Sequence, residues 1–227
     1  MRSLLLTMMV FIGLAIPCSA DDADIAESLQ DVSVTVLAPG LVGSGTVCEG
    51  GYILTCAHVV AGADITGKIA NITVYQDTYR EGNFVRRRRT TARIYKYSAD
   101  NDAGLDVAVL KMDQPEIFPT RVHLINRRVA RVGTSIYICG SPQGTQNHNS
   151  VTRGIVSFTG RFINNRIHDQ TDAAMFQGTS GGGVYTLSGE YIGMLSRGNG
   201  SGIGYYLPKR VIVKYLRENG LSRICDQ

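Results

Sequence analysis

Short apolar runs separated by turn residues follow one another along nearly the whole chain. Several of them, such as residues 32–37, alternate apolar and polar side chains, which is typical of a β-strand with one buried face. The predicted strands cover residues 32–37, 44–48, 52–55, 72–75, 91–97, 107–112, 135–139, 151–159, 173–176, 183–187, 191–196 and 204–207. Strands at this short spacing, in a chain with 26 glycines, predict an all-β protein built as a barrel or sandwich.

Two segments have a helical pattern instead. Residues 23–29 begin next to aspartates, which suit the positive end of a helix. Residues 209–219 lie between Pro208 and Gly220, the expected asymmetry at the two ends of a helix. One face of this second helix is expected to pack on a barrel; its residues are Val211, Tyr215 and Leu216.

The first 20 residues have the pattern of a secretory signal peptide. Arg2 gives a positive start, residues 4–16 form an apolar core, and small residues follow Pro17. We therefore expect cleavage near residue 21, a secreted or periplasmic mature protein, and no stable membrane insertion afterwards. An uncleaved membrane anchor is the alternative, although the apolar run is shorter than the roughly 20 residues that span a bilayer.

The net charge of the chain bears on whether nucleic acid is a partner. Without Arg2 the mature chain has 22 basic and 19 acidic residues, a small and scattered excess that gives no reason to expect nucleic-acid binding. A chain of 227 residues also needs no covalent staples to fold, because it buries a large share of its surface.

The mature sequence has four cysteines, namely Cys48, Cys56, Cys139 and Cys225. We predict a hairpin after Cys48 that turns at residues 50–51, so that Cys48 faces Ile53. Cys56 then lies roughly 10 Å away along the ladder, beyond the reach of a disulfide. Cys139 lies within an apolar run and is expected to be a buried free thiol. We predict no disulfide on which the fold depends.

Three segments together have the residues for nucleophilic hydrolysis: LTCAHVV at 54–60, GLDVAVL at 104–110 and GTSGGG at 178–183. Peptide hydrolysis by serine needs a hydroxyl, a base to take its proton and a carboxylate to orient the base. His58 follows an apolar strand, Asp106 precedes one, and Ser180 lies in a glycine-rich loop. The glycines allow the amides of Gly178 and Ser180 to converge as an oxyanion hole. Each segment alone is most often structural, so the prediction depends on their joint occurrence.

In the order His, Asp, Ser, these motifs resemble those of the chymotrypsin-type serine proteases. Four further stretches resemble the HtrA-type bacterial exported proteases: GSG at 43–45, GYILT at 51–55, TDAA at 171–174 and GIGYYLP at 202–208. The resemblance runs from about residue 24 to about residue 220. It implies two perpendicular six-stranded β-barrels at about 30–116 and 117–207, a short N-terminal helix, and a C-terminal helix at about 208–219.

The resemblance also implies a serine endopeptidase that cleaves protein or peptide substrates through an acyl-enzyme. His58, Asp106 and Ser180 would be its catalytic triad, with the oxyanion hole at Gly178 and Ser180. No cofactor and no metal are implied. An oligomer is compatible with the sequence but not indicated by it.

The same resemblance implies a substrate-binding pocket formed by Ala174, Met175, Leu195, Ser196, Arg197 and Gly204. Ala174 stands where trypsin-like enzymes have an acid, so we expect a small or medium apolar residue before the scissile bond. Arg197 is expected to add a charge preference at the edge of the cleft.

Some features depart from the family patterns. Thr179 replaces the aspartate that pairs with a freed N-terminus in digestive enzymes, and no matching start lies near Asp21. Residues 176–179 read FQGT where the HtrA-type pattern has Asn-Pro-Gly-Asn, which leaves the resting conformation of the oxyanion loop open. Most members of that branch carry a PDZ domain after the protease. We expect none here.

The remaining motifs have mainly structural interpretations. Residues 86–89, four consecutive arginines, are interpreted as a solvated hairpin loop, with an anionic contact or an internal cleavage site as alternatives. Three histidines show no metal-ligand spacing: His123, His148 and His168. Glycosylation patterns at Asn71 and Asn199 matter only in a eukaryotic secretory pathway. Two alternatives to an active protease are an inactive protease-like binding module and a chaperone or stress sensor.

Overall fold

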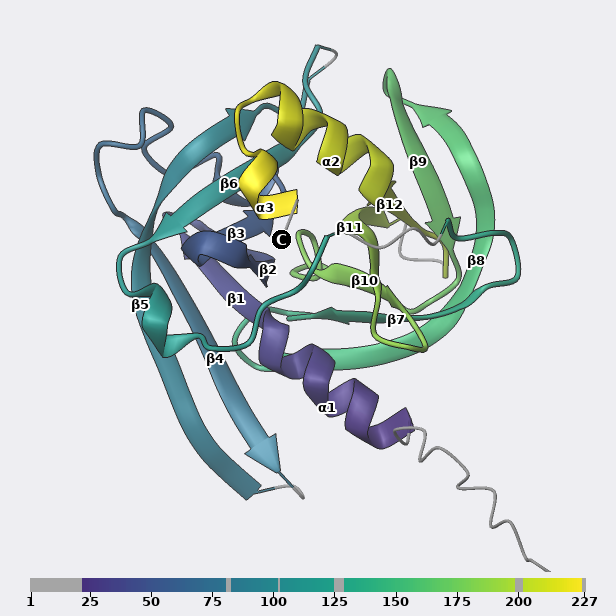
Figure 1. Cartoon of the computed structure of the whole chain (residues 1–227), viewed down its shortest axis with the longest axis horizontal. Helices are drawn as coiled ribbons and strands as arrows, with labels where there is room; N and C mark the ends of the chain where they lie inside the picture. The colour runs from purple at the N-terminus through teal and green to yellow at the C-terminus, as the bar shows by residue number, and fades with distance from the viewer. Residues whose placement is uncertain (1–21, 81–82, 102, 125–128, 199–201, 226–227) are drawn as a thin grey trace, which may run out of the picture.

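The computed structural model describes residues 22–80, 83–101, 103–124, 129–198 and 202–225. Within these residues, strands form two closed barrels with the orders β1-β2-β3-β6-β5-β4 and β10-β11-β12-β9-β8-β7. The two barrels lie side by side in Figure 1, the first in purple to teal and the second mostly in green. The prediction of an all-β fold with two six-stranded barrels is confirmed. The signal-peptide prediction concerns residues outside the described ranges, as does the glycosylation pattern at Asn199.

The first barrel consists of β1 (Ser33–Ala38), β2 (Leu41–Cys48), β3 (Tyr52–Thr55), β4 (Ile72–Arg80), β5 (Asn83–Ser98) and β6 (Val107–Met112). Strands β3 and β6 pair with each other, with Ile53 opposite Leu110, and β3 is buried along its whole length. A strand buried on both faces is a continuous apolar run. The ends of these two rigid strands lead directly into the two segments that carry His58 and Asp106.

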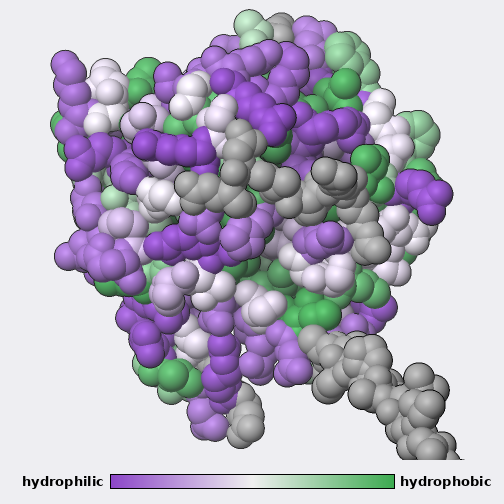
Figure 2. Space-filling view, viewed as in Figure 1, coloured by the Kyte–Doolittle hydropathy of each residue, from purple (hydrophilic) through white to green (hydrophobic). Residues whose placement is uncertain are grey.

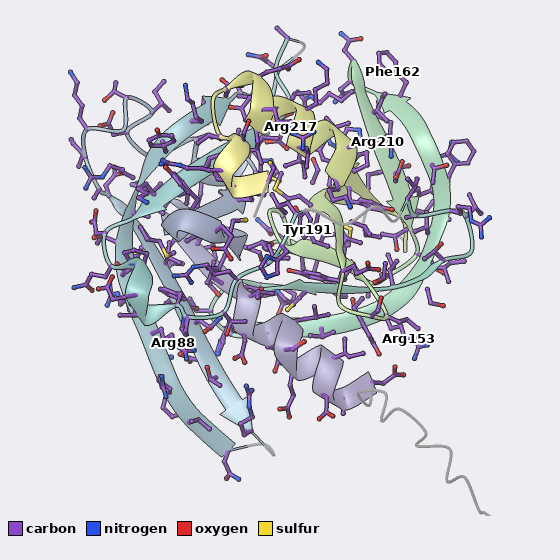
Figure 3. The ribbon with its side chains drawn as sticks, in the orientation of Figure 1. Arg88, Arg153, Phe162, Tyr191, Arg210 and Arg217 are labelled. Carbon is purple, nitrogen blue, oxygen red and sulfur yellow. The ribbon has the colours of Figure 1, made fainter. Side chains whose placement is uncertain are left out.

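The second barrel consists of β7 (Ser135–Gly140), β8 (Ser150–Ile163), β9 (Arg166–Thr171), β10 (Gly183–Thr186), β11 (Tyr191–Gly198) and β12 (Gly204–Pro208). Strands β8 and β9 form a long hairpin that turns at Asn164 and Asn165, both with positive φ. Asparagine tolerates this conformation better than most residues. Phe162 lies near the end of the hairpin and is largely exposed (Figure 3).

Helices pack against the barrels. They are α1 (Asp22–Val32), α2 (Lys209–Glu218) and α3 (Ser222–Cys225), with short 3-10 turns at Glu49–Gly51, His58–Val60 and Pro115–Ile117. The prediction for the buried face of α2 is partly wrong: Tyr215 and Leu216 are buried, but Ile212 is the third buried residue and Val211 is half-buried. Residues at i, i+3 and i+4 share a helix face, so Ile212 is the position that fits with the other two.

Two predicted segments differ from the structure. Residues 173–176 are not a strand; the strand is β9, which sequence reasoning missed because it buries polar residues such as His168 and Asp169. The arginines at residues 86–89 lie within β5 and not in a loop. Cross-strand partners on β4 explain this, since Arg87 forms two hydrogen bonds with Asp77 and its neighbour Arg88 bonds to Gln76 and Thr78.

The structure has no disulfide among the four described cysteines, all of them buried: Cys48, Cys56, Cys139 and Cys225. The predicted register of the hairpin after Cys48 is wrong by one residue. Cys48 faces Tyr52 because the turn contains three residues, Glu49–Gly51, of which Gly50 and Gly51 both have positive φ.

Much of the visible surface is polar. Figure 2 shows hydrophilic residues over most of the coloured part of this face, with hydrophobic residues in small separate groups. Among the described residues, no helix is long and apolar enough to cross a membrane.

Candidate active site

His58 and Asp106 are joined by several hydrogen bonds. His58 is the first residue of the 3-10 turn after β3, and Asp106 directly precedes β6. The ring Nδ1 of His58 lies 2.9 Å from Oδ2 and 3.0 Å from Oδ1 of Asp106, and the amide nitrogen of His58 donates to Oδ1 at 3.0 Å. An ionised carboxylate only accepts, so the proton of a neutral imidazole lies on Nδ1 and the lone pair on Nε2. Nε2 is therefore available as a base.

The carboxylate of Asp106 is fully buried and has a third donor. The hydroxyl of Ser196, from β11, donates to Oδ2 of Asp106 at 3.1 Å. Sequence reasoning placed Ser196 in the substrate pocket, but its side chain reaches the buried carboxylate. Asp106 itself has a φ of 59°, which is uncommon outside glycine and occurs most readily in Asn and Asp. Strained backbone of this kind is found preferentially at functional sites.

Cys56 lies beside the same pair. Its thiol donates to the carbonyl oxygen of Leu195 at 3.1 Å. Burial raises the pKa of this thiol, and the charge of Asp106 raises it further, so the group stays protonated. The donor atoms of Cys56, His58 and Asp106 lie within 4.8 Å of one another and could in principle hold a metal ion. Each of these three side chains already takes part in a hydrogen bond, which favours a hydrogen-bonded cluster over a metal site.

Ser180 lies in the loop that connects β9 to β10, and this loop is held against the first barrel by Ser44 of β2. The amide of Ser44 donates to the carbonyl of Ser180 at 2.8 Å, and its hydroxyl donates to the carbonyl of Gly178 at 2.7 Å. Gly181 has a φ of 88°, and a Cβ there would lie 2.1 Å from the carbonyl oxygen of Ser44. Only glycine therefore allows the loop to approach this closely. The motif at residues 43–45 thus joins the two barrels.

His58 and Ser180 line one cleft of about 590 Å³. Its other lining residues are Asp100, Met175, Phe176, Gln177, Thr179, Ser196, Arg197 and Gly198. The hydroxyl of Ser180 donates to the carbonyl of Ser196 at 3.2 Å. Within the part of the chain that the structure describes, no hydrogen bond joins this hydroxyl to the ring of His58. His58 and Ser180 still line the same cleft, and Asp106 is bonded to His58 behind it.

The peptide between Gln177 and Gly178 has a defined orientation. The carbonyl of Gln177 accepts from the amide of Gln143 at 2.7 Å. Because this peptide is trans, the amide of Gly178 points to the opposite side, away from Gln143. Gly178 has a φ of 97°, and a Cβ there would lie 2.4 Å from the carbonyl oxygen of Ser141. These contacts select glycine at this position and fix the loop that precedes Ser180.

The residues predicted for the substrate pocket do not all line the cleft. Met175, Ser196 and Arg197 do, whereas Ala174 lines a separate pocket of about 300 Å³ and Leu195 is fully buried. Gly204 lies beneath Met175, since a Cβ on Gly204 would lie 2.1 Å from the Met175 sulfur. The Met175 side chain therefore closes the floor of the cleft on this side.

Sequence reasoning missed two charged residues, Asp100 at the cleft and Arg166 buried behind it. Asp100, from the loop between β5 and β6, lines it and accepts from Arg166 at 2.5 Å. Arg166 is almost fully buried and also donates to the carbonyls of Gly104 and Asn101. Nothing in the local pattern of Arg166 indicates that it crosses from β9 to the loop that leads to Asp106.

Two closed six-stranded barrels with a His–Asp pair and a serine at a shared cleft define the chymotrypsin-like class of folds. The family model of the trypsin-like peptidase domain matches residues 43–194, and the chain belongs to this family. A DegP-like periplasmic serine endoprotease of Hahella chejuensis is 34% identical over 193 residues, covering 78% of this chain and 36% of that protein. One from Rhizobium meliloti is 30% identical over 200 residues, covering 82% and 36%. The predicted resemblance is confirmed.

Solved structures agree with this family. A serine endoprotease from Yersinia pestis matches with a TM-score of 0.69 at 25% identity, covering 89% of this chain and 67% of that one. Deg5 matches with a TM-score of 0.68 at 26% identity, covering 88% and 95%. The chain spans about a third of the length of the curated relatives it matches.

Proposed function

We propose that this protein is a serine endopeptidase that hydrolyses peptide bonds of protein substrates through an acyl-enzyme. Ser180 is the nucleophile, His58 the general base and then acid, and Asp106 the residue that orients and stabilises the imidazole. The observation that carries the proposal is the buried carboxylate of Asp106 on Nδ1 of His58, with Nε2 left for Ser180 in the same cleft.

The reaction begins with a rotation of the Ser180 hydroxyl from the Ser196 carbonyl toward His58. The proton passes to Nε2 as Oγ attacks the substrate carbonyl, and the same proton then goes to the leaving amine as the C–N bond breaks. Water then attacks the acyl-enzyme while His58 takes its proton, and His58 returns that proton to Ser180 as the carboxylic acid product leaves. The resting hydrogen bond of Ser180, at 3.2 Å to a neutral carbonyl, is weak enough to exchange on substrate binding.

The oxyanion of the tetrahedral intermediate is stabilised by the amides of Gly178 and Ser180. The hydrogen bond from Gln143 to the Gln177 carbonyl supports this role, because it turns the Gly178 amide away from Gln143 before substrate arrives. A donor positioned in this way contributes on the order of 10²–10³ in rate.

The residue before the scissile bond is a small or medium apolar one. Met175 covers Gly204 and makes the pocket shallow. The carboxylate that lines the cleft, Asp100, is already bonded to Arg166 and Arg197 and is not free to bind a basic side chain. A shallow apolar floor accepts a few carbons and excludes a long cationic chain.

The protein acts after export, in the periplasm or outside the cell, once residues 1–20 have been removed. Relatives named as periplasmic endoproteases support this location. Its partners are protein or peptide substrates. Nucleic acid is not among them, and the mature protein has no stable membrane insertion.

A fluorophosphonate probe tests the proposal, because it labels only an activated serine. The mature parent is expected to be labelled and to cleave casein, whereas Ser180→Ala is expected to do neither while keeping its circular dichroism spectrum. Ser188→Ala, which alters a serine near the β10–β11 turn, is the matched control and is expected to react like the parent. An unlabelled, folded parent would favour the inactive binding module instead.

A further inference from the structure

Three charged side chains meet at one wall of the cleft. Oδ1 of Asp100 accepts from Nη1 of Arg166 at 2.5 Å and from Nη2 of Arg197 at 3.1 Å. Asp100 and Arg197 line the cleft together with His58. Two guanidinium groups thus share a single carboxylate at a surface that substrate would contact.

The two arginines are not equivalent. The side chain of Arg166 is 2% exposed and is held by three hydrogen bonds. It therefore stays bonded to Asp100 when substrate binds in the cleft. The side chain of Arg197 is 28% exposed, and it shares Oδ1 at the longer distance. Arg197 is therefore the arginine with donors to offer to a ligand.

Asp100 remains ionised at neutral pH. Burial raises the pKa of its carboxyl, but the hydrogen bond from Arg166 and the charges of Arg166 and Arg197 outweigh this and lower the pKa below its ordinary value. The three side chains together then carry one net positive charge. Asp106, the other carboxylate nearby, is buried beneath His58 and bonded to it.

We infer that Arg197 binds an acidic side chain at the second or third substrate residue before the scissile bond, and that basic side chains are disfavoured there. This inference depends on the proposed protease function. A substrate carboxylate replaces only the 3.1 Å contact to Asp100, which Arg166 continues to neutralise. A lysine or arginine of the substrate would instead be repelled by the two guanidinium groups, because the Asp100 carboxylate is already bonded to both of them.

This subsite is separate from the apolar floor. Met175 packs toward Gly198 and Gly204, where Cβ atoms would lie 3.4 Å from its Cβ and 2.1 Å from its sulfur. Arg197 extends to the other side, toward Asp100 on the first barrel. The cleft therefore has one place for an apolar side chain and a neighbouring place for a negatively charged one.

Matched peptides test the inference. Each has alanine before the scissile bond and carries Glu, Gln or Lys at one of the two preceding positions. For the parent, kcat/KM with Glu is expected to exceed that with Gln by about two- to fivefold at one position, with Lys below Gln. The ratio should fall toward one at high ionic strength, because salt screens a partly exposed ion pair.

Two variants separate charge from shape. Arg197→Gln is expected to bring the Glu/Gln ratio to about one, and Arg197→Lys to keep most of it. A parent that cleaves all peptides with a Glu/Gln ratio of one at both positions overturns the inference. So does an Arg197→Gln variant that is faster on both peptides by the same factor, since the contact with Asp100 would then close the cleft without reading charge. A parent that cleaves no peptide and takes up no fluorophosphonate overturns the proposed function itself.

Discussion

Asp106 accepts hydrogen bonds from both the ring and the main chain of His58, at 2.9 Å from Nδ1 and 3.0 Å from the amide nitrogen. It does so from a left-handed backbone conformation, with φ of 59°. Asparagine adopts this conformation readily, so Asp106→Asn keeps the backbone and removes the charge. A neutral amide would neither fix the proton on Nδ1 nor stabilise the imidazolium that the proposed mechanism forms during acylation.

The expected result for Asp106→Asn is a loss of about 10³–10⁴ in kcat. Its melting temperature should stay within about 5 °C of the parent. Both are measured on one preparation, by peptide hydrolysis and by thermal denaturation followed by circular dichroism. Asp113→Asn, which removes an exposed carboxylate bonded to Arg93 away from the cleft, is the control and should keep full activity. Equal activity of the two variants would contradict the role of Asp106.

The oxyanion loop gives a second prediction. Gly178→Ala places a Cβ 2.4 Å from the Ser141 carbonyl oxygen, whereas Gly220 has a similar positive φ of 74° and a Cβ there meets nothing within 4 Å. Both variants carry the backbone strain of alanine at positive φ, roughly 1–2 kcal/mol, but only the first must displace the loop. Gly178→Ala is therefore expected to lose about 10²–10³ in kcat.

Steady-state kinetics and fluorophosphonate labelling rates check this prediction. Gly220→Ala should react at the parent's rate and show only a lower melting temperature. If both glycine variants react alike, the position of the Gly178 amide has no part in catalysis.

The architecture and the meeting of His58, Asp106 and Ser180 at one place could be predicted, because these residues lie in distinctive motifs beside strongly apolar strands. Strand β9 could not, since it buries polar residues that find partners across the fold. Asp169, for example, bonds to Arg210 of α2. The arginines of β5 were misread for the same reason. The hydrogen bond with Asp77 explains why Arg87 lies in a strand, but it can be recognised only once the pairing of β4 with β5 is known.

In the cleft, too, contacts that depend on the packing of distant segments could not be predicted from the sequence. The sequence places Ser196 in the substrate pocket, but its contact with Asp106 depends on how β11 of the second barrel lies against the segment that precedes β6 of the first. Asp100 and Arg166 are 66 positions apart in the sequence, and each looks like an ordinary surface residue. Motifs thus predict which residues meet at the cleft, whereas the charges that surround them follow from the packing of the two barrels.

The floor of the cleft gives a third prediction. Met175→Ala removes the side chain that covers Gly204 and deepens the pocket. The preferred residue before the scissile bond should shift from small apolar residues toward leucine and phenylalanine, with kcat/KM for a phenylalanine peptide rising about tenfold relative to an alanine peptide. Cleavage-site profiling measures this shift. Ala174→Ser, which alters a residue outside the cleft, should leave the profile unchanged. A profile that moves with Ala174 and not with Met175 would reverse the assignment.

His168 gives a fourth prediction, on stability. This histidine of β9 is fully buried, and burial, together with the charges of Arg197 and Arg166, lowers the pKa of its ring below the ordinary value, although Asp106 acts in the opposite sense. As the pH falls through about 6.5, the histidine of the unfolded chain takes up a proton that the folded protein refuses. The unfolded state then binds more protons, so the free energy of unfolding decreases with falling pH.

Urea denaturation at about pH 7 and about pH 5 measures the size of this loss, roughly 1.4 kcal/mol for each pH unit between the two pKa values. His168→Asn removes the titrating group and should flatten the dependence on pH. His123→Asn, at an exposed histidine, removes the same chemical group without the burial and should leave the parent's slope intact. If His168→Asn loses as much stability on acidification as the parent does, the loss comes from other groups, and the buried ring is not responsible for it.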